Sequence, residues 1–587
     1  MKTAVRCGGS LLVALLPLVE RLYDTSDYLP LGIGTGLCAV CSMLLLVRRP
    51  LVGLTRTDVA ACLCLLYLMV RAAFCGTTSL ASCFLFLYAA LLYVTARLAD
   101  GAQRCTLLYG LVLGGLLQAF IAWLQYMGLV PSMHSLFACT GTFLNPAPLG
   151  GWLSMGMIAA FGLWKEGKAF FRRTRTMLVL ALLLMGSALV LADSRASWVA
   201  CGSVLLLMSM KKWFSACRYR WAILVSVVLM AILPLYLYRR SSADSRLFIW
   251  KVCAEMVQDA PLFGQGPQGV KRCYMHFQAD YLENQGTAYE RLQATDNSLA
   301  FNEGIRILCE YGFVGCLLML LSLLLAWMES RRGIPFRYLL SGFLVFACFS
   351  YPSDVFSLLS VFFLMLGCLP SLPIRNLHIK RQLAVCLFSV PLLFGLVYVY
   401  ASFRANRALD HFYWDEEAEA EWQRCYPLFQ NEREPVSRYA HTLVLSGEYA
   451  SAISPLEQLI KLSPTVEIYN DLGYCYQMVG EVMKAESCYR YASSMAPGRI
   501  LPHYRLFRLY RSQKDWKRMR EEGGYILTMD VKIENEKVKR IREEVEVALR
   551  KKRVCRNKIS LPKCHSEHRE ESVDIYFVFT DPSLRSG

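Results

Sequence analysis

The chain has 587 residues, of which 55% are hydrophobic and only 19% are charged, a composition that excludes an ordinary soluble protein. Lys and Arg number 63 and Asp and Glu 46, so the net charge is +17. Because the cations of the apolar part lie mostly in short loops between hydrophobic runs, they indicate membrane orientation and no nucleic-acid partner.

Apolar segments follow one another from the N-terminus to residue 402, and we expect about 12–13 of them to cross a membrane as helices. The first, at 8–21, follows Lys2 and Arg6. Since no cleavage site comes after it, we interpret it as a short membrane helix and not as a signal sequence. The others are predicted at 30–47, 57–73, 79–96, 106–127, 148–164, 177–193, 196–210, 221–238, 312–328, 338–350, 355–370 and 382–402.

Lys and Arg gather in alternate connections, which predicts the orientation because cytoplasmic loops carry such an excess. Examples are Arg48, Arg49 and Arg56, the stretch 165–175, and the group Arg331, Arg332 and Arg337. The N-terminus is therefore predicted inside. Three larger stretches are predicted outside: 130–148, the loop of about 239–311, and everything after residue 402.

Two C-terminal segments align with an offset of about 33 residues. Gly447-Glu448-Tyr449, then Ala452 and Pro464, matches Gly480-Glu481-Val482, then Ala485 and Pro497. This period and these small residues resemble tetratricopeptide repeats, which stack into an α-solenoid that offers a surface to protein partners. An ordinary helical bundle is the alternative.

The predicted fold is therefore all-α, a polytopic membrane domain with a long outer loop and a C-terminal α-solenoid. Helices 1–9 occupy 1–238, the loop that carries the chemistry 239–311, and helices 10–13 occupy 312–402. A linker at 403–431, repeats at 432–530, and a helical extension with a disordered tail at 531–587 follow.

Four segments of the predicted outer face carry residues suited to chemistry. The first is 141–146, which contains Asn145 and leads into a helix. The second is 194–198, whose Arg195 either snorkels to the surface or binds an anion. The third joins Arg246 and Trp250 to the turn at 261–266. The fourth is Phe301-Asn302, followed after nine residues by Gly312-Phe313-Val314-Gly315.

Together these segments resemble the O-antigen ligase and oligosaccharide polymerase superfamily of bacterial envelope enzymes, over about residues 1–402. In that family the signature after the long periplasmic loop is His, then Asn, Ser or Gln, nine residues, and GxxG. The spacing and the GxxG fit here, but Phe301 stands where the family has its His.

The resemblance implies transfer of a glycan from an undecaprenyl-diphosphate carrier, on the periplasmic side of a bacterial inner membrane. The family's two key arginines map onto Arg195 and Arg246, where a guanidinium can pair bidentately with the leaving diphosphate. We further predict substrate contacts at Asn145, Trp250, Asn302 and His276. We expect no cofactor and no metal, since the sequence has no nucleotide-binding, metalloprotease or paired CxxC motif.

The missing histidine leaves the general base open, because Phe301 cannot accept a proton. Our first choice is Glu303, which lies two positions along the same helix start, and His276 and Asp296 are further candidates. Strong activation of the leaving group without a base, or loss of activity in this chain, are the alternatives.

The acceptor is also open: the lipid A core in a ligase, another lipid-linked repeat unit in a polymerase, or a protein. Membrane lipid and a protein bound at the repeats are the other expected partners. A transporter of lipid-linked saccharide and a non-catalytic scaffold are the competing classes. The transporter is disfavoured, because we see no repeated hydropathy half and few charges within the segments, among them Arg71.

Overall fold

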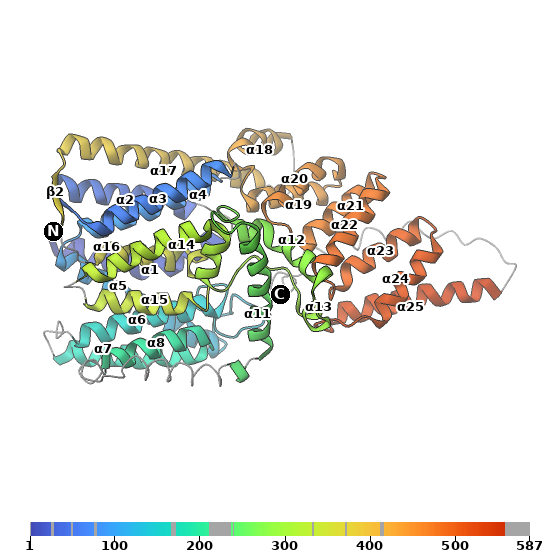
Figure 1. The fold of residues 1–587 in the computed structure, drawn as a ribbon, viewed down its shortest axis with the longest axis horizontal. Coiled ribbons are helices and arrows are strands. Elements are labelled where there is room, and N and C mark those ends of the chain that lie inside the picture. Colours follow the sequence, from blue (N-terminus) through green and yellow to red (C-terminus); the bar gives the residue numbers. More distant parts are fainter. Residues whose placement is uncertain are drawn as a thin grey trace. The chain divides into compact units, whose positions relative to one another are not determined.

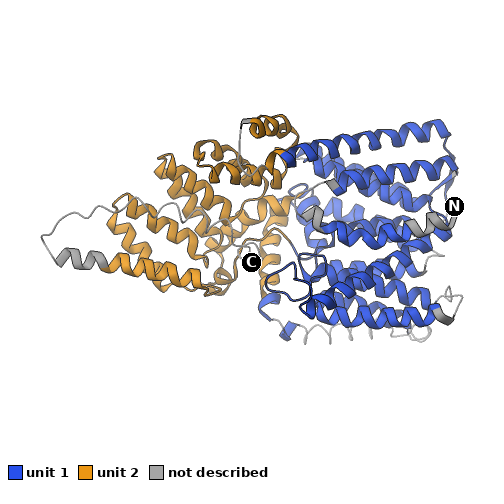
Figure 2. Cartoon of the chain, turned by 180° about the vertical axis from the view of Figure 1, so that it is seen from behind, with its two compact units in different colours: residues 1–243, 260–267, 300–407 blue, residues 244–259, 268–299, 408–587 orange. Residues whose placement is uncertain are grey.

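In the computed structural model the chain is mostly helical and forms two compact units (Figures 1 and 2). The structure describes residues 2–24, 29–48, 51–75, 79–165, 172–209, 236–238, 240–330, 334–369, 373–410 and 416–557. Unit 1 comprises residues 1–243, 260–267 and 300–407, and unit 2 comprises residues 244–259, 268–299 and 408–587. The long predicted loop is therefore divided between the two units.

Unit 1 is a bundle of apolar helices that run side by side (Figure 1). Among the described residues, eight helices are long and apolar enough to cross a membrane, and four shorter apolar helices accompany them. The helices are α1 (Lys2–Asp24), α2 (Leu29–Arg48), α3 (Arg56–Phe74), α4 (Leu80–Leu98), α5 (Gly101–Tyr126), α6 (Pro146–Lys165), α7 (Arg172–Leu191), α8 (Arg195–Ser209), the start of α11 (Arg240–Asp259), α14 (Glu303–Glu329), α15 (Ile334–Ala347), α16 (Phe356–Cys368) and α17 (Arg381–Leu409). Unit 1 is thus a multi-pass membrane domain.

The predicted apolar segments coincide with described helices, except the one at 221–238, which lies almost wholly outside the described residues. The segment predicted at 312–328 coincides with the part of α14 that follows a break at Gly312, and α14 as a whole begins earlier, at Glu303. Asn302 caps this earlier turn, since its side chain accepts a hydrogen bond from the Ile305 amide at 3.1 Å. Residues 303–311 are too polar for hydropathy to assign them to the same helix.

The core of unit 1 is centred on α6, whose most apolar window is 78% buried. Its Trp152 is fully enclosed. Small residues let the neighbouring helices approach, because a Cβ on Gly151 would lie 2.7 Å from the Phe346 ring and one on Gly156 would lie 3.0 Å from the Leu111 carbonyl oxygen. Such close packing is a main source of association between membrane helices.

A buried carboxylate joins α1 to α16. Glu20 is 2% exposed and accepts hydrogen bonds from the backbone amides of Phe356 at 2.8 Å and Ser357 at 2.9 Å. The first amides of a helix have no partner within it, and negative charge is favourable at that end. Glu20 therefore caps α16 just after the 3₁₀ turn η1 (Pro352–Asp354).

Two short strands pair next to the N-terminus of α3. β1 (Leu51–Leu54) pairs antiparallel with β2 (Arg375–His378), with Leu51 opposite His378. The ribbon joins the α2–α3 connection to the α16–α17 connection, both of which are basic in sequence. At its end, Thr55 and Asp58 form a capping box that begins α3.

Unit 2 combines most of the long loop with the C-terminal helices (Figure 2). Its helices are the rest of α11, α12 (Gly269–Asn284), α13 (Ala288–Gln293), α18 (Glu416–Phe429), α19 (Arg433–Leu445), α20 (Tyr449–Leu462), α21 (Val466–Met478), α22 (Val482–Met495), α23 (Ile500–Ser512), α24 (Trp516–Thr528) and α25 (Glu536–Asn557). From α19 to α24 they form three successive helix pairs. The turns within the pairs place Gly447, Gly480 and Lys514 at φ of 82°, 88° and 59°. The first two positions are the aligned glycines of the sequence.

The linker predicted at 403–431 is largely helical, since α17 continues to Leu409 and α18 fills most of the remainder. Trp422, Cys425 and Phe429 follow the spacing of one helix face and are 0%, 6% and 1% exposed. The Trp422 ring lies 5.5 Å from that of Tyr439 on α19. α18 is therefore a folded part of unit 2. The predicted tail beyond residue 557 lies outside the described residues.

Candidate functional site

The turn at 261–266 is bonded to a break in α14. Gly312, with φ 63° and ψ −168°, interrupts the helix and leaves backbone groups without helical partners. Four backbone hydrogen bonds satisfy them: Gln265 and Gly266 donate to Cys309 and Glu310 at 2.8 Å each, Phe313 donates to Pro261 at 2.9 Å, and Val314 donates to Leu262 at 3.2 Å. We call the turn at 261–266 and the break in α14 at 309–314, joined by these four bonds, the motif clasp.

Two glycines make the motif clasp possible. A Cβ on Gly312 would lie 2.3 Å from the Leu262 carbonyl oxygen, and one on Gly264 would lie 2.4 Å from the Glu310 carbonyl carbon. Both glycines also have positive φ, 63° and 66°, where other residues are strained. The third glycine, Gly315, lies against the side chain of Tyr311, whose Cβ would be 2.4 Å from an added Cβ.

Helix α3 supports the motif clasp from the side. The Tyr67 hydroxyl donates to the Tyr311 carbonyl at 2.7 Å, and Arg71 Nη2 donates to the Gly264 carbonyl at 2.9 Å. The Arg71 guanidinium also lies over the Phe263 ring, 5.9 Å from its centroid. Arg71, the charge noted within an apolar segment of the sequence, therefore hydrogen-bonds to the motif clasp.

The residues before α14 dock on the turn between α15 and α16. Phe301, at the position of the family histidine, has φ 51° and packs edge-on against Tyr351 with ring centroids 5.5 Å apart. A positive φ is unusual for a bulky side chain. Beside it, Asn302 Nδ2 donates to the Cys348 carbonyl at 2.9 Å while its oxygen caps α14. The side chain of Asn302 is thus engaged in holding this segment.

Glu303, the predicted base, is the centre of a small polar cluster. Its Oε1 accepts from the Ser353 hydroxyl at 2.5 Å and from the Ser353 amide at 3.1 Å. Its Oε2 pairs with Arg306 at 2.8 Å, and Arg306 also pairs with the buried Glu310 at 3.1 Å. These partners fix the orientation of the Glu303 carboxylate.

Two glutamines of α5 hold the loop at 140–142. Gln125 accepts from the amides of Thr140 at 3.0 Å and Gly141 at 2.8 Å. Gln118 accepts from the Thr142 amide and donates to the Thr142 hydroxyl, both at 3.0 Å. The loop is thereby fastened just before Asn145, which is partly exposed and immediately precedes α6.

Arg195 lies at the first position of α8, where this helix packs closely on α6. A Cβ on Gly150 would lie 2.5 Å from the Ser197 hydroxyl oxygen, so the small residue lets the two helices meet. Ser194 and Ser197 hydrogen-bond to each other at 2.7 Å in the first turn. Arg195 itself is partly exposed, and its Nη2 donates to Ser242 at 3.1 Å. The second sequence segment thus packs on α6, the helix into which the first segment leads.

The other predicted residues belong to unit 2. Arg246 and Trp250 are partly exposed residues of α11. His276 on α12 lies with Nδ1 2.6 Å from the Tyr491 hydroxyl, and burial lowers the pKa of its imidazole although Asp280 opposes the shift. Asp296 accepts from the Val466 amide at 2.8 Å and pairs with Arg499 at 2.9 Å. The loop segment 268–299 is therefore bonded to the C-terminal helices.

Several residues of the site were missed in the sequence. Gln118 and Gln125 are polar, lie seven positions apart within an apolar segment, and so share one helix face, which is a signal that could have found them. Tyr67 and Ser353 gave no such signal, because they act on groups distant in the chain.

Residues 180–320 match a family model described as O-Antigen ligase. The matched range contains Arg195, Arg246 and the whole motif clasp, whereas the loop at 140–142 lies before it. No curated protein and no solved structure matches the chain. The match supports a glycan-transfer role for this multi-pass membrane protein, with a lipid-linked glycan and a glycan acceptor as partners.

Proposed function

We propose that the chain transfers a glycan from an undecaprenyl-diphosphate carrier to an acceptor at the periplasmic face of a bacterial inner membrane. The observation that carries the proposal is the motif clasp. The residues by which the sequence resembles the ligase and polymerase superfamily are those that interlock at 261–266 and 312–315, within the matched range. The resemblance is thus supported by a physical role for Gly264, Gly312 and Gly315.

In the proposed reaction the acceptor hydroxyl oxygen attacks the anomeric carbon, and the bond from that carbon to the carrier diphosphate breaks. The electron pair goes to the diphosphate, whose growing charge Arg195 and Arg246 stabilise. Arg195 suits this role because it lies at the N-terminus of α8, where the helix itself favours an anion. The acceptor proton goes to Glu303, whose carboxylate is oriented by Arg306 and Ser353.

Asn145 and Trp250, both partly exposed, are proposed to contact the glycan or its carrier. Asn302 and His276 already bond within the chain, so we propose that they position their segments for the substrate. The helix pairs α19–α24 are proposed to be tetratricopeptide-like repeats that bind a protein partner. Their bonds to the loop segment 268–299 would let such a partner influence transfer.

Deletion of the gene in its own host, followed by gel analysis of surface polysaccharide, tests the proposal. Long chains lost from the lipid core, with lipid-linked polymer accumulating, indicate a ligase. Single repeat units left on the core indicate a polymerase, and a change confined to glycosylated proteins indicates a protein glycosyltransferase. A glycan pattern identical to that of the parent strain contradicts the proposal. Expression of the intact chain in the deletion strain is the control.

A further inference from the structure

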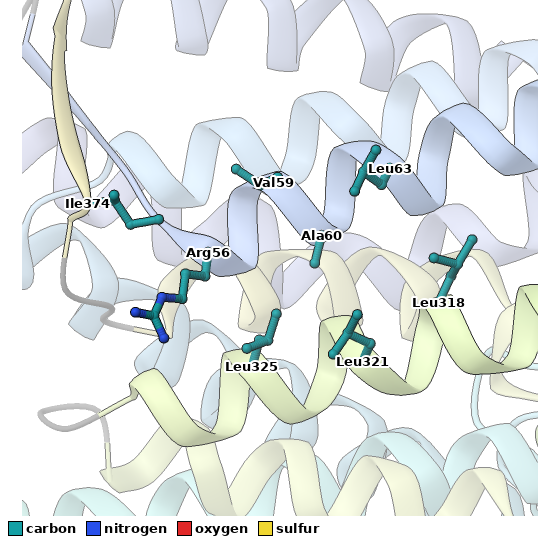
Figure 3. Close-up of a pocket in the computed structure, with 8 residues that line it drawn as sticks. All are labelled: Arg56, Val59, Ala60, Leu63, Leu318, Leu321, Leu325 and Ile374. Carbon is teal, nitrogen blue, oxygen red and sulfur yellow. The ribbon is translucent and has the colours of Figure 1, made fainter.

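A second feature of unit 1 is an apolar groove of about 290 Å³ between α3 and α14 (Figure 3). Val59 and Leu63 line it from α3, and Leu318, Leu321 and Leu325 line it from α14. Val59, Leu63 and Leu321 are 43%, 53% and 46% exposed, so the groove is open on one side.

The groove lies between two helices that are long and apolar enough to cross a membrane. In the hydrocarbon layer no water is present to fill such a space, and its apolar walls match a hydrocarbon chain. An acyl chain of a membrane lipid is therefore the occupant that fits its walls and surroundings.

One end of the groove is cationic. The Arg56 guanidinium lies there, beside Ile374 and Leu325 (Figure 3). Arg56 is exposed, and so is Arg375 on the neighbouring strand β2. Nearby acids are bonded elsewhere, since Asp58 pairs with Arg97 at 3.2 Å and Glu329 accepts from the Thr57 hydroxyl at 2.9 Å. A guanidinium at the mouth of an apolar groove complements a lipid phosphate.

This cation lies far from the motif clasp. Arg56 and Arg71 are at opposite ends of α3, 71 − 56 = 15 residues apart, which is about 22 Å along a helix. Arg71 bonds to the motif clasp, so a phosphate held at Arg56 belongs to the other side of the bilayer. The occupant is thus a phospholipid of the opposite leaflet and not the glycan carrier.

We propose that this groove is a binding site for one anionic phospholipid, with an acyl chain between α3 and α14 and its phosphate on Arg56. The site does not depend on the proposed glycan transfer. Its role is to bind a structural lipid beside the helix that supports the motif clasp.

Native mass spectrometry of the full chain tests the proposal after incubation in detergent with equal amounts of phosphatidylglycerol and phosphatidylcholine. We expect the intact chain to retain phosphatidylglycerol preferentially, and Arg56→Gln to lower this preference about 5-fold. Arg56→Lys should keep most of it, because the charge remains. Leu321→Phe should lower lipid retention by filling the groove without changing any charge.

Matched controls are Arg175→Gln and Leu180→Phe on α7, which are exposed residues of the same kinds away from the groove. Both should behave like the intact chain. The proposal is overturned if Arg56→Gln keeps the full preference, if Arg175→Gln loses as much, or if Leu321→Phe retains lipid unchanged. A polypeptide retained in place of lipid would overturn it as well.

Discussion

At the residue scale, the motif clasp depends on the absence of side chains at Gly312 and Gly264. We predict that Gly312→Ala destabilises unit 1 by about 1–3 kcal/mol or more, because it adds strain at positive φ to a contact of 2.3 Å with a backbone oxygen. The matched control is Gly202→Ala in α8, where nothing lies within 4 Å of an added Cβ. Thermal denaturation of both variants in detergent checks this, and equal melting temperatures would contradict it.

The two arginines provide the second residue-scale prediction. Arg195→Ala and Arg246→Ala should each lower transfer about 100-fold or more, as loss of one charge-stabilising donor commonly does. Lys at either position should recover only part, because it lacks the bidentate geometry. Transfer from a lipid-linked donor by purified variants, at matched protein levels, measures the effect. Near-normal rates in both Ala variants would remove the diphosphate role.

Glu303 can be tested against its structural partners. If it accepts the proton, Glu303→Gln should lower transfer by about 10²–10⁴-fold, and Phe301→His should partly restore that variant. Ser353→Ala removes only the hydroxyl that donates to Glu303 at 2.5 Å, so its effect should be much smaller. Equal losses in Glu303→Gln and Ser353→Ala, with no rescue by Phe301→His, would mean that the cluster only holds α14 in place.

At the element scale, α21 contains an unfavourable charge. Burial and, to a lesser extent, the charge of Glu467 raise the pKa of Asp471 from 3.8 to about 7, with Arg505 opposing the shift. The folded state therefore binds the proton more tightly than the unfolded state, so the stability of unit 2 falls as pH rises from about 4 to about 7. The loss is complete above the folded pKa.

We therefore predict that Asp471→Asn stabilises α21 by about 2–4 kcal/mol at about pH 8, and that its advantage shrinks toward pH 4. Hydrogen exchange of α21 in the full chain measures this. Glu419→Gln, at an exposed carboxylate of α18, should change little at any pH. A benefit of Asp471→Asn that is equally large at both pH values would show that charge is not its cause.

At the scale of the whole molecule, the basic connections predict the orientation in the membrane. A reporter that is active only in the periplasm should work when fused after residue 285 or 430, and should be silent after Lys168 or Arg332. Activity after Lys168 would reverse the orientation, and with it the side of the membrane proposed for the motif clasp. The lipid groove would then move to the periplasmic leaflet.

The sequence alone was sufficient to predict the apolar helices of the described residues, the helix pairs after residue 432 and the resemblance carried by the glycine motifs. Hydropathy, repeat period and motif spacing depend on residues that are close along the chain, so they can be recognised without knowing the tertiary structure. The prediction missed helical residues where this local signal changes, as in the polar turns of α14 before Gly312 and in α18.

Only the tertiary structure decided what the motifs do. The motif clasp joins residues about fifty positions apart through backbone amides and carbonyls, which every residue carries and no motif reports. In the same way, the division of the long loop between two units follows from contacts such as Asp296 with Val466 and Arg499. These pairings depend on how the helices pack, and the packing energy is shared among side chains that lie far apart in sequence.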